Sequence, residues 1–119
     1  MIEPLRRRSC FAAFRGARAG RSGAVRARVV ADLVPPDRVG VAYALNRKVG
    51  GAVTRNRIRR RLRSAVDALD KRGGVLQDGA GYLVAADPDA ASCQYAVLQA
   101  WVEDAVRAAN SRSTERTPR

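Results

Sequence analysis

The 119-residue sequence contains no histidine. This absence excludes a catalytic triad of serine, histidine and aspartate, a cysteine nucleophile activated by histidine, and a zinc site built on imidazole. The only two cysteines, Cys10 and Cys93, stand too far apart in the chain to form a CxxC motif. We expect both to be reduced thiols, as is usual in the cytoplasm.

Long apolar runs are missing as well. No segment approaches the length of a membrane span, and the N-terminus lacks the apolar core of a signal peptide. We therefore expect a cytoplasmic protein without a membrane partner. The length predicts one domain with a modest core. We place that domain at residues 1–110, with a basic arm at residues 1–8 and a disordered polar tail at residues 111–119.

Acidic residues are scarce in the first half of the chain. Residues 1–66 hold 17 Lys and Arg against three acids, a net charge of +14, whereas residues 67–119 hold six against eight, a net charge of −2. Like charges repel one another in a compact domain, so this excess predicts a polyanionic partner. Of the 23 basic residues 21 are arginine, which suits phosphate contact and stacking on bases. Nucleic acid is the favoured partner, and an anionic membrane is the weaker alternative.

Six arginines occur in the nine residues from Arg55 to Arg63. The spacing of nonpolar residues predicts a helix here, from Val53 to Lys71, with Thr54 as its N-cap and Gly73 after its end. Its predicted buried face consists of Ile58, Leu62, Ala65, Val66 and Leu69. Its outer face carries Asn56, Arg59, Arg60, Arg63 and Asp67, with Arg57 and Arg61 at the flank. Because no acid occurs between Arg47 and Val66, this face suits an array of anions better than solvent alone.

Period-two alternation before this helix predicts two strands. The first runs from Ala24 to Val34 with Arg26 and Arg28 on one face, and the second runs from Val39 to Asn46. We expect the two strands to pair antiparallel across the turn that separates them. The first of them therefore presents an arginine-bearing face.

The remaining elements are a short helix over Cys10–Arg15, a buried strand over Gly81–Ala86 and a last helix that Ser92 caps. In the last helix we expect a buried stripe of Tyr95, Leu98, Val102, Ala105 and Val106. The predicted order is α-β-β-α-β-α. This order predicts an α+β fold in which helices pack on one sheet as a two-layer α/β sandwich.

No catalytic constellation is evident. The closest acid pair, Asp87 and Asp89, flanks a proline, which is typical of a turn. A stand-alone nuclease that holds a metal on these two carboxylates is the competing interpretation. The glycine pair at Gly50 and Gly51 lacks the spacing and the Lys-Ser/Thr ending of a P-loop. The sequence therefore indicates a binding surface and no hydrolytic site.

Three parts are expected to converge on that surface: the outer face of the arginine-rich helix, the Arg26 and Arg28 face of the first strand, and the aromatic rings of Phe11 and Phe14. Guanidinium groups that contact phosphates, together with rings that stack on bases, bind single-stranded nucleic acid with little sequence preference. The alternative for Phe11 and Phe14 is a small core that docks the first helix on the sheet.

The segment Lys48-Val49-Gly50-Gly51-Ala52-Val53-Thr54-Arg55-Asn56-Arg57, followed by Arg60 and Arg63, closely resembles the signature of the bacterial ribonuclease P protein family. The resemblance extends from Leu5 to the closing helix. Gly51 stands where the family usually has Asn, and Phe11 and Phe14 are three residues apart instead of four. Arg26 and Arg28 occupy a strand that often carries an aromatic residue, which suggests phosphate contact in place of base stacking.

The resemblance implies an α/β sandwich with a left-handed βαβ crossover. It also implies a function, as the protein subunit of a ribonucleoprotein endoribonuclease that removes the 5′ leader from precursor tRNA. In that family the RNA subunit performs the hydrolysis, and Mg²⁺ is bound mainly by this RNA and the substrate. No catalytic or metal-binding residue and no protein oligomer are then required of this chain. The alternative function is a structural RNA-binding protein of the ribosomal type.

Carried over by position, the resemblance assigns Arg55, Asn56 and Arg57 to the catalytic RNA. It places Asn56, Arg59, Arg60 and Arg63 along the leader cleft, together with Phe11 or Phe14. The full set of predicted RNA-binding residues is Arg47, Lys48, Arg55, Asn56, Arg57, Arg59, Arg60 and Arg63. The predicted leader-cleft residues are Phe11, Phe14, Arg26 and Arg28.

Overall fold

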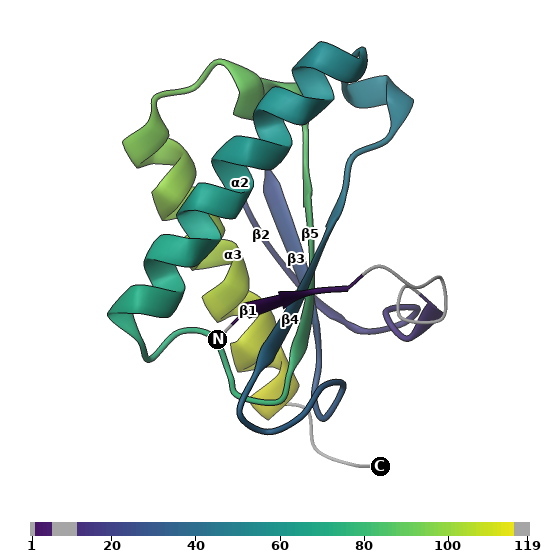
Figure 1. The fold of residues 1–119 in the computed structure, drawn as a ribbon, viewed down its shortest axis with the longest axis vertical. Coiled ribbons are helices and arrows are strands. Elements are labelled where there is room, and N and C mark those ends of the chain that lie inside the picture. Colours follow the sequence, from purple (N-terminus) through teal and green to yellow (C-terminus); the bar gives the residue numbers. More distant parts are fainter. Residues whose placement is uncertain (1, 6–11, 116–119) are drawn as a thin grey trace.

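A five-stranded sheet with two long helices on one side makes up the protein (Figure 1), seen in a computed structural model that describes residues 2–5 and 12–115. The strands are β1 (Ile2–Pro4), β2 (Arg18–Ser22), β3 (Val25–Val30), β4 (Val39–Ala44) and β5 (Gly81–Ala86). The helices are α2 (Ala52–Arg72) and α3 (Tyr95–Glu115), and the short 3₁₀ helices are η1 (Arg47–Val49) and η2 (Pro88–Ala91). The predicted two-layer α+β sandwich is confirmed. None of these helices is both long and apolar enough to cross a membrane.

The strand order is β1-β4-β5-β3-β2. We expected β3 and β4 to pair with each other, which is wrong because β5 lies between them, antiparallel to β3 and parallel to β4. The parallel pair β4 and β5 requires a crossover, and α2 provides it. These three elements form the βαβ unit whose handedness the family resemblance implies to be left-handed.

Two strands were missed by the sequence analysis. β1 lies in the segment that we expected to be a basic arm, and it pairs parallel with β4, where Ile2 stands opposite Val39. Three residues at a sheet edge are too few to show a period of two. β2 pairs with β3 across a two-residue turn in which Gly23 has φ 54°, a conformation that suits tight hairpins.

The helix α2 matches its prediction closely. Its buried residues are Ile58, Leu62, Ala65, Val66 and Leu69. Gly73 follows the last helical residue with φ 75°, and its N–H donates to the Leu69 carbonyl, as a C-terminal glycine commonly does. The N-cap is Gly51 instead of Thr54, which lies one turn too late to precede the helix.

The helix α3 differs from its prediction at both ends. It begins at Tyr95, and Ser92 instead ends η2. Tyr95 is 37% exposed, so the buried stripe begins at Leu98. The helix continues to Glu115, five residues into the range predicted as a disordered tail. Each residue added to an existing helix gains one backbone hydrogen bond at modest entropic cost, which requires no buried side chain.

The first helix that we predicted, Cys10–Arg15, lies partly outside the described residues, and so do Cys10 and Phe11. From Ala13 to Gly16 the chain forms turns, in which the Ala17 N–H donates to the Phe14 carbonyl at 3.1 Å. Phe14 is 2% exposed and shares a small core with Leu5 and Ala42. This small core covers one end of the sheet face that carries no long helix.

Candidate nucleic-acid interface

The sheet has a helix-covered face and an open face. In β3 the residues Val25, Ala27 and Val29 are buried under the helices, so Arg26 and Arg28 point the other way. The register places Arg26 beside Ala85 of β5, and Ala85 beside Ala44 of β4. A strand alternation that the sequence predicts therefore places two guanidinium groups on the open face.

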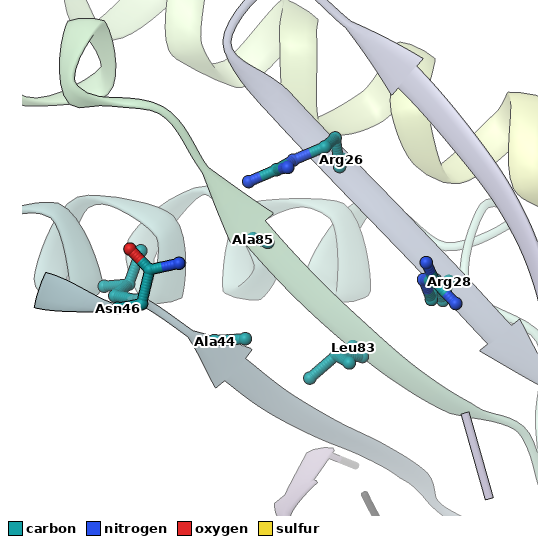
Figure 2. Close-up of a pocket in the computed structure, with 7 residues that line it drawn as sticks. Arg26, Arg28, Ala44, Asn46, Leu83 and Ala85 are labelled. Carbon is teal, nitrogen blue, oxygen red and sulfur yellow. The ribbon is translucent and has the colours of Figure 1, made fainter. Parts of the chain in front are cut away.

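The open face carries a pocket of about 340 Å³. It is lined by Arg26, Arg28, Ala44, Leu45, Asn46, Leu83 and Ala85 (Figure 2). Its floor consists of small and apolar side chains from β4 and β5, and the arginines rise from β3 beside it. A floor of this kind lets an extended chain lie close to the sheet, and the cations at its side suit a phosphate backbone.

Contacts within the protein orient the arginines of this pocket. The Arg28 Nη1 donates to the Phe14 carbonyl oxygen at 3.2 Å. The Arg26 Nη2 lies 3.5 Å from one Asp87 carboxylate oxygen, and the Arg21 Nη2 donates to the other at 2.9 Å. Arg26 and Arg21 remain about half exposed, so their guanidinium groups are accessible to an anion.

The predicted role of Phe14 in the cleft needs correction. Its ring is buried against Leu5 and Ala42, which leaves no face on which a base can stack. The alternative of a small core is the correct one for this residue. Phe14 borders the open face only through its backbone oxygen, which orients Arg28. Phe11 lies outside the described residues, so its predicted role stays a prediction.

Arg21 was missed as a residue of the open face. It lies opposite Arg26 in the pairing of β2 with β3, and both border a second hollow that extends over β2. The sequence signal was the Ser22-Gly23 pair, which often marks a turn; a hairpin that turns at Gly23 and Ala24 would have paired residues 18–22 with β3.

The outer face of α2 presents most of its predicted side chains. Asn56, Arg57, Arg60 and Arg63 are exposed, whereas Arg55 and Arg59 are half-buried. The Arg59 Nη1 donates to the Asn56 Oδ1 at 2.8 Å, so that amide oxygen is occupied by a neighbour one turn away. The helix therefore shows an arginine-rich face to solvent, as predicted.

One arginine of α2 is used inside the protein. The Arg61 Nη1 donates to the Ala90 carbonyl at 2.7 Å, and its Nη2 donates to the Cys93 carbonyl. Ala90 lies in η2, and Cys93 lies in the segment that joins η2 to α3. Arg61 thus holds this part of the chain against α2, whereas its neighbours Arg60 and Arg63 are exposed to solvent.

The N-terminal end of α2 lies at the end of the sheet where β4 finishes. Asn46 borders the open-face pocket, and its Oδ1 accepts a hydrogen bond from the Lys48 N–H at 3.0 Å. Arg47 and Lys48 are exposed there, and the first turn of α2 contains no acid. Free backbone N–H groups and the helix dipole add to the positive potential of these side chains.

The expected single cleft does not form, which is a second correction. Ile58 and Leu62 bury α2 against the helix-covered face, whereas Arg26 and Arg28 point from the opposite face. Arg59 and Arg63 line a separate groove at the β4 edge of the sheet, with Tyr43. The two arginine surfaces are separate because α2 packs on the face opposite Arg26 and Arg28, and no local sequence pattern shows which face a helix will cover.

One carboxylate of the loop after β5, that of Asp87, is used in ion pairing. Asp87 accepts a hydrogen bond from Arg21 and precedes the proline that begins η2, in agreement with the turn interpretation. Within residues 2–5 and 12–115 no three acidic, cysteine or histidine side chains gather in an arrangement that would hold a metal ion.

Comparisons with known proteins agree with these observations. A sequence model of the Ribonuclease P family matches residues 3–110. The ribonuclease P protein component of Thermobifida fusca is 38% identical over 122 residues, covering 91% of this chain and 78% of the relative. That of Streptomyces avermitilis is 38% identical over 104 residues, covering 79% of this chain and 80% of the relative.

Solved structures show the same fold at low sequence identity. The RNase P protein from Thermotoga maritima superposes with a TM-score of 0.73 at 16% identity, covering 88% of this chain and 96% of the other. The Staphylococcus aureus RNase P protein gives 0.71 at 16% identity, covering 87% and 92%.

Proposed function

The chain belongs to the ribonuclease P protein family. It is thus the protein component of a ribonucleoprotein endoribonuclease and has an RNA partner. We propose that two of its surfaces bind two different RNAs. The open face of the sheet binds the single-stranded 5′ leader of precursor tRNA. The outer face and N-terminal end of α2 bind the catalytic RNA. The residues proposed for the catalytic RNA are Arg47, Lys48, Arg55, Asn56, Arg57 and Arg60.

The observation that carries the leader assignment is the row formed by Arg26 and Arg28 above a floor of small side chains. Two residues on one face of a strand are about 6.7 Å apart along it, comparable to successive phosphates of an extended chain. With Phe14 buried, the described part of this face binds backbone phosphates and reads no base. We therefore propose that leader recognition here depends weakly on sequence.

The family resemblance implies how the protein and the RNA share the reaction, and the basic side chains of this chain fit that division. The protein neutralises phosphates and positions the substrate, and the hydrolysis belongs to the RNA. Mg²⁺ is the metal that the family resemblance implies, and RNA phosphates provide the oxygen ligands that it prefers. The cytoplasm, where a bacterial cell makes precursor tRNA, is the compartment that this function requires. Family membership favours this function over a ribosomal-type structural protein.

Reconstitution tests the function as a whole. Adding the protein to a matched catalytic RNA at low Mg²⁺ should accelerate removal of the leader, while the protein alone cuts nothing. Absence of stimulation would contradict the proposed role, and cleavage by RNA-free protein that Asp87→Asn abolishes would support a nuclease in its own right.

The leader assignment has its own test. In the reconstituted enzyme, the double variant Arg26→Ala, Arg28→Ala should weaken the binding of precursor tRNA more than that of mature tRNA. The slope of log affinity against log salt should fall by about 0.7 for each single-strand phosphate contact that is lost. Arg107→Ala, which removes one cation of α3 away from the open face, is the control for a loss of positive charge elsewhere. An equal loss for both tRNAs would show that the open face does not bind the leader.

A further inference from the structure

Arg59 and Arg63 do not line the open-face pocket, so the leader proposed to bind there does not account for them. They line a groove of about 490 Å³ at the edge of β4, just beyond the end of β1. Ile2, Leu5 and Tyr43 contribute its apolar and aromatic lining, and Asp67 stands at the same wall as the arginines. This β4-edge groove combines cations, an aromatic ring and a carboxylate.

The charged residues of the groove form one row along α2. Arg59, Arg63 and Asp67 follow one another at intervals of four residues, which places them on the same side of the helix. At 1.5 Å per residue the row is about 12 Å long. It begins with two guanidinium groups and ends with a carboxylate, so the groove has a cationic end and an anionic end.

The two arginines are already oriented by neighbours. The Arg59 guanidinium donates to Asn56 at 2.8 Å. The Arg63 guanidinium carbon lies 6.0 Å from the centroid of the Tyr43 ring, within the range of a cation–π contact. Orientation before binding lowers the entropic cost of receiving a ligand.

Tyr43 keeps its hydroxyl proton over the whole physiological range. Burial raises its pKa from 10.0 to about 12, and the nearby Asp67 carboxylate adds to this while Arg63 opposes it. The ring therefore remains neutral and offers an apolar face together with one O–H donor. A neutral ring beside a guanidinium is a stacking site for a nucleobase.

The β4-edge groove matches the parts of one nucleotide. The paired guanidinium groups suit a phosphate, and the Tyr43 ring with its apolar surroundings suits a base. A carboxylate accepts hydrogen bonds from exposed N–H groups, and guanine offers two adjacent N–H donors on its Watson–Crick edge. Uracil and cytosine do not offer this pair of donors, so the anionic end of the row at Asp67 distinguishes guanine from either.

We propose that the β4-edge groove binds one unpaired guanine nucleotide of an RNA chain, with its phosphate on Arg59 and Arg63, its base against Tyr43 and its N–H donors on Asp67. The inference rests on the proposed function only for the source of this nucleotide, which is the catalytic RNA. The groove lies at the β4 edge of the sheet and shares no lining residue with the pocket of Arg26 and Arg28, so one protein engages two RNA segments.

The test uses the full chain and fluorescently labelled pentaribonucleotides, UUGUU and UUCUU, with affinity measured by anisotropy at low salt. The wild type should prefer UUGUU at least about fivefold, the discrimination expected of one good bidentate base contact. Asp67→Asn should bring the preference close to one without weakening UUCUU, and Arg63→Ala should weaken both. Arg26→Ala, Arg28→Ala should weaken both pentamers and leave the guanine preference equal or larger, because the open face binds single-stranded RNA without reading its bases.

The opposite results would overturn the proposal. These are a wild type without guanine preference, a preference that survives Asp67→Asn, or one that disappears with Arg26→Ala, Arg28→Ala. Guanosine monophosphate that binds as tightly as UUGUU would show a site for free nucleotides and none for RNA. Crosslinking of a pentamer that carries 6-thioguanine should label Tyr43 or the adjoining β1, and labelling of β3 alone would also contradict the assignment. Thermal unfolding confirms that each variant is folded.

Discussion

The two long helices, α2 and α3, have the same length and lie on the same side of the sheet, yet the protein uses them differently (Figure 1). α3 packs against β2 and β3, and buries Leu98, Val102 and Ala109. α2 packs against α3 and η2 through one narrow stripe and leaves an arginine-rich face in solvent. α3 therefore contributes mainly to the core, whereas α2 contributes to the core and also exposes arginines to solvent.

The difference originates in how closely each helix approaches its neighbours. A Cβ added to Gly20 of β2 would lie 2.2 Å from the Ala105 carbonyl oxygen, so α3 and β2 touch backbone to backbone. α2 is held by larger side chains such as Ile58 and Leu62. A helix that rests on one stripe of aliphatic side chains keeps the rest of its circumference available for function.

The largest expected effect comes from the buried side of α3. Leu98 is fully buried, so Leu98→Ala should lower the free energy of unfolding by about 2–5 kcal/mol through lost burial and the remaining cavity. Urea denaturation measures the loss. At temperatures where the variant is folded, its affinity for RNA and the salt dependence of that affinity should equal those of the wild type. A parallel loss of RNA affinity would mean that α3 also belongs to the interface.

The next largest effect distinguishes two neighbouring arginines of α2, Arg60 and Arg61. Arg61→Ala leaves the Ala90 and Cys93 carbonyls without their donor, and should cost about 1–3 kcal/mol of stability with little change in RNA affinity. Arg60→Ala should change stability by less than about 0.5 kcal/mol, because its side chain is exposed. The same substitution should weaken the binding of the catalytic RNA. Urea denaturation should therefore show the larger loss of stability for Arg61→Ala, and filter binding should show the larger loss of RNA affinity for Arg60→Ala. If one variant shows the larger loss in both measurements, the two arginines do not have separate roles.

These two helices also show what the sequence can reveal. Both buried stripes follow from nonpolar spacing, which depends only on neighbours one or two turns away. The alternation of Arg26 and Arg28 with buried residues in β3 is equally local. The five buried residues of α2 were therefore predicted, and so was the existence of an arginine face on β3.

Features that depend on distant contacts were not predictable in this way. The position of β5 between β3 and β4 depends on which strands pair. The separation of Arg26 from Arg59 depends on the face of the sheet on which α2 packs. The burial of Phe14 depends on Leu5 and Ala42, which other elements bring to it. The inward use of Arg61 depends on carbonyls in η2 and after it, because no residue near it in sequence supplies an acceptor.

A smaller effect concerns the tyrosine beneath α2. The pKa of Tyr43 is raised from 10.0 to about 12, chiefly by burial, so the folded state retains a proton that the unfolded state loses above pH 10. The contribution of Tyr43 to the free energy of unfolding should therefore be constant below pH 10 and fall by about 1–2 kcal/mol as the pH rises toward 12. Comparing wild type with Tyr43→Phe isolates this component. Phenolate absorbance that shows every tyrosine ionising near pH 10 would contradict it.

The smallest expected effect lies where the two helices are tied together. The Glu103 carboxylate of α3 accepts hydrogen bonds from Arg72 Nη2 of α2 at 2.8 Å and from Arg107 Nε at 2.9 Å, and these arginines hold its pKa below the usual value. A lowered carboxyl pKa stabilises the fold above the unfolded value of 4.5 and loses that contribution as the pH falls. Glu103→Gln should thus lower Tm slightly at neutral pH and have no effect in acid.

Added salt should change the Tm of the protein and the Tm difference of Glu103→Gln in opposite directions. Added salt should raise the Tm of the whole protein, because it screens the repulsion within a half of net charge +14. The same salt should shrink the difference in Tm between the wild type and Glu103→Gln, because it screens an attraction. The two responses have opposite signs because α2 collects like charges for a partner, whereas Glu103 pairs opposite charges within the protein. A Tm difference for Glu103→Gln that salt does not reduce would show that packing, and not charge, joins the ends of the two helices.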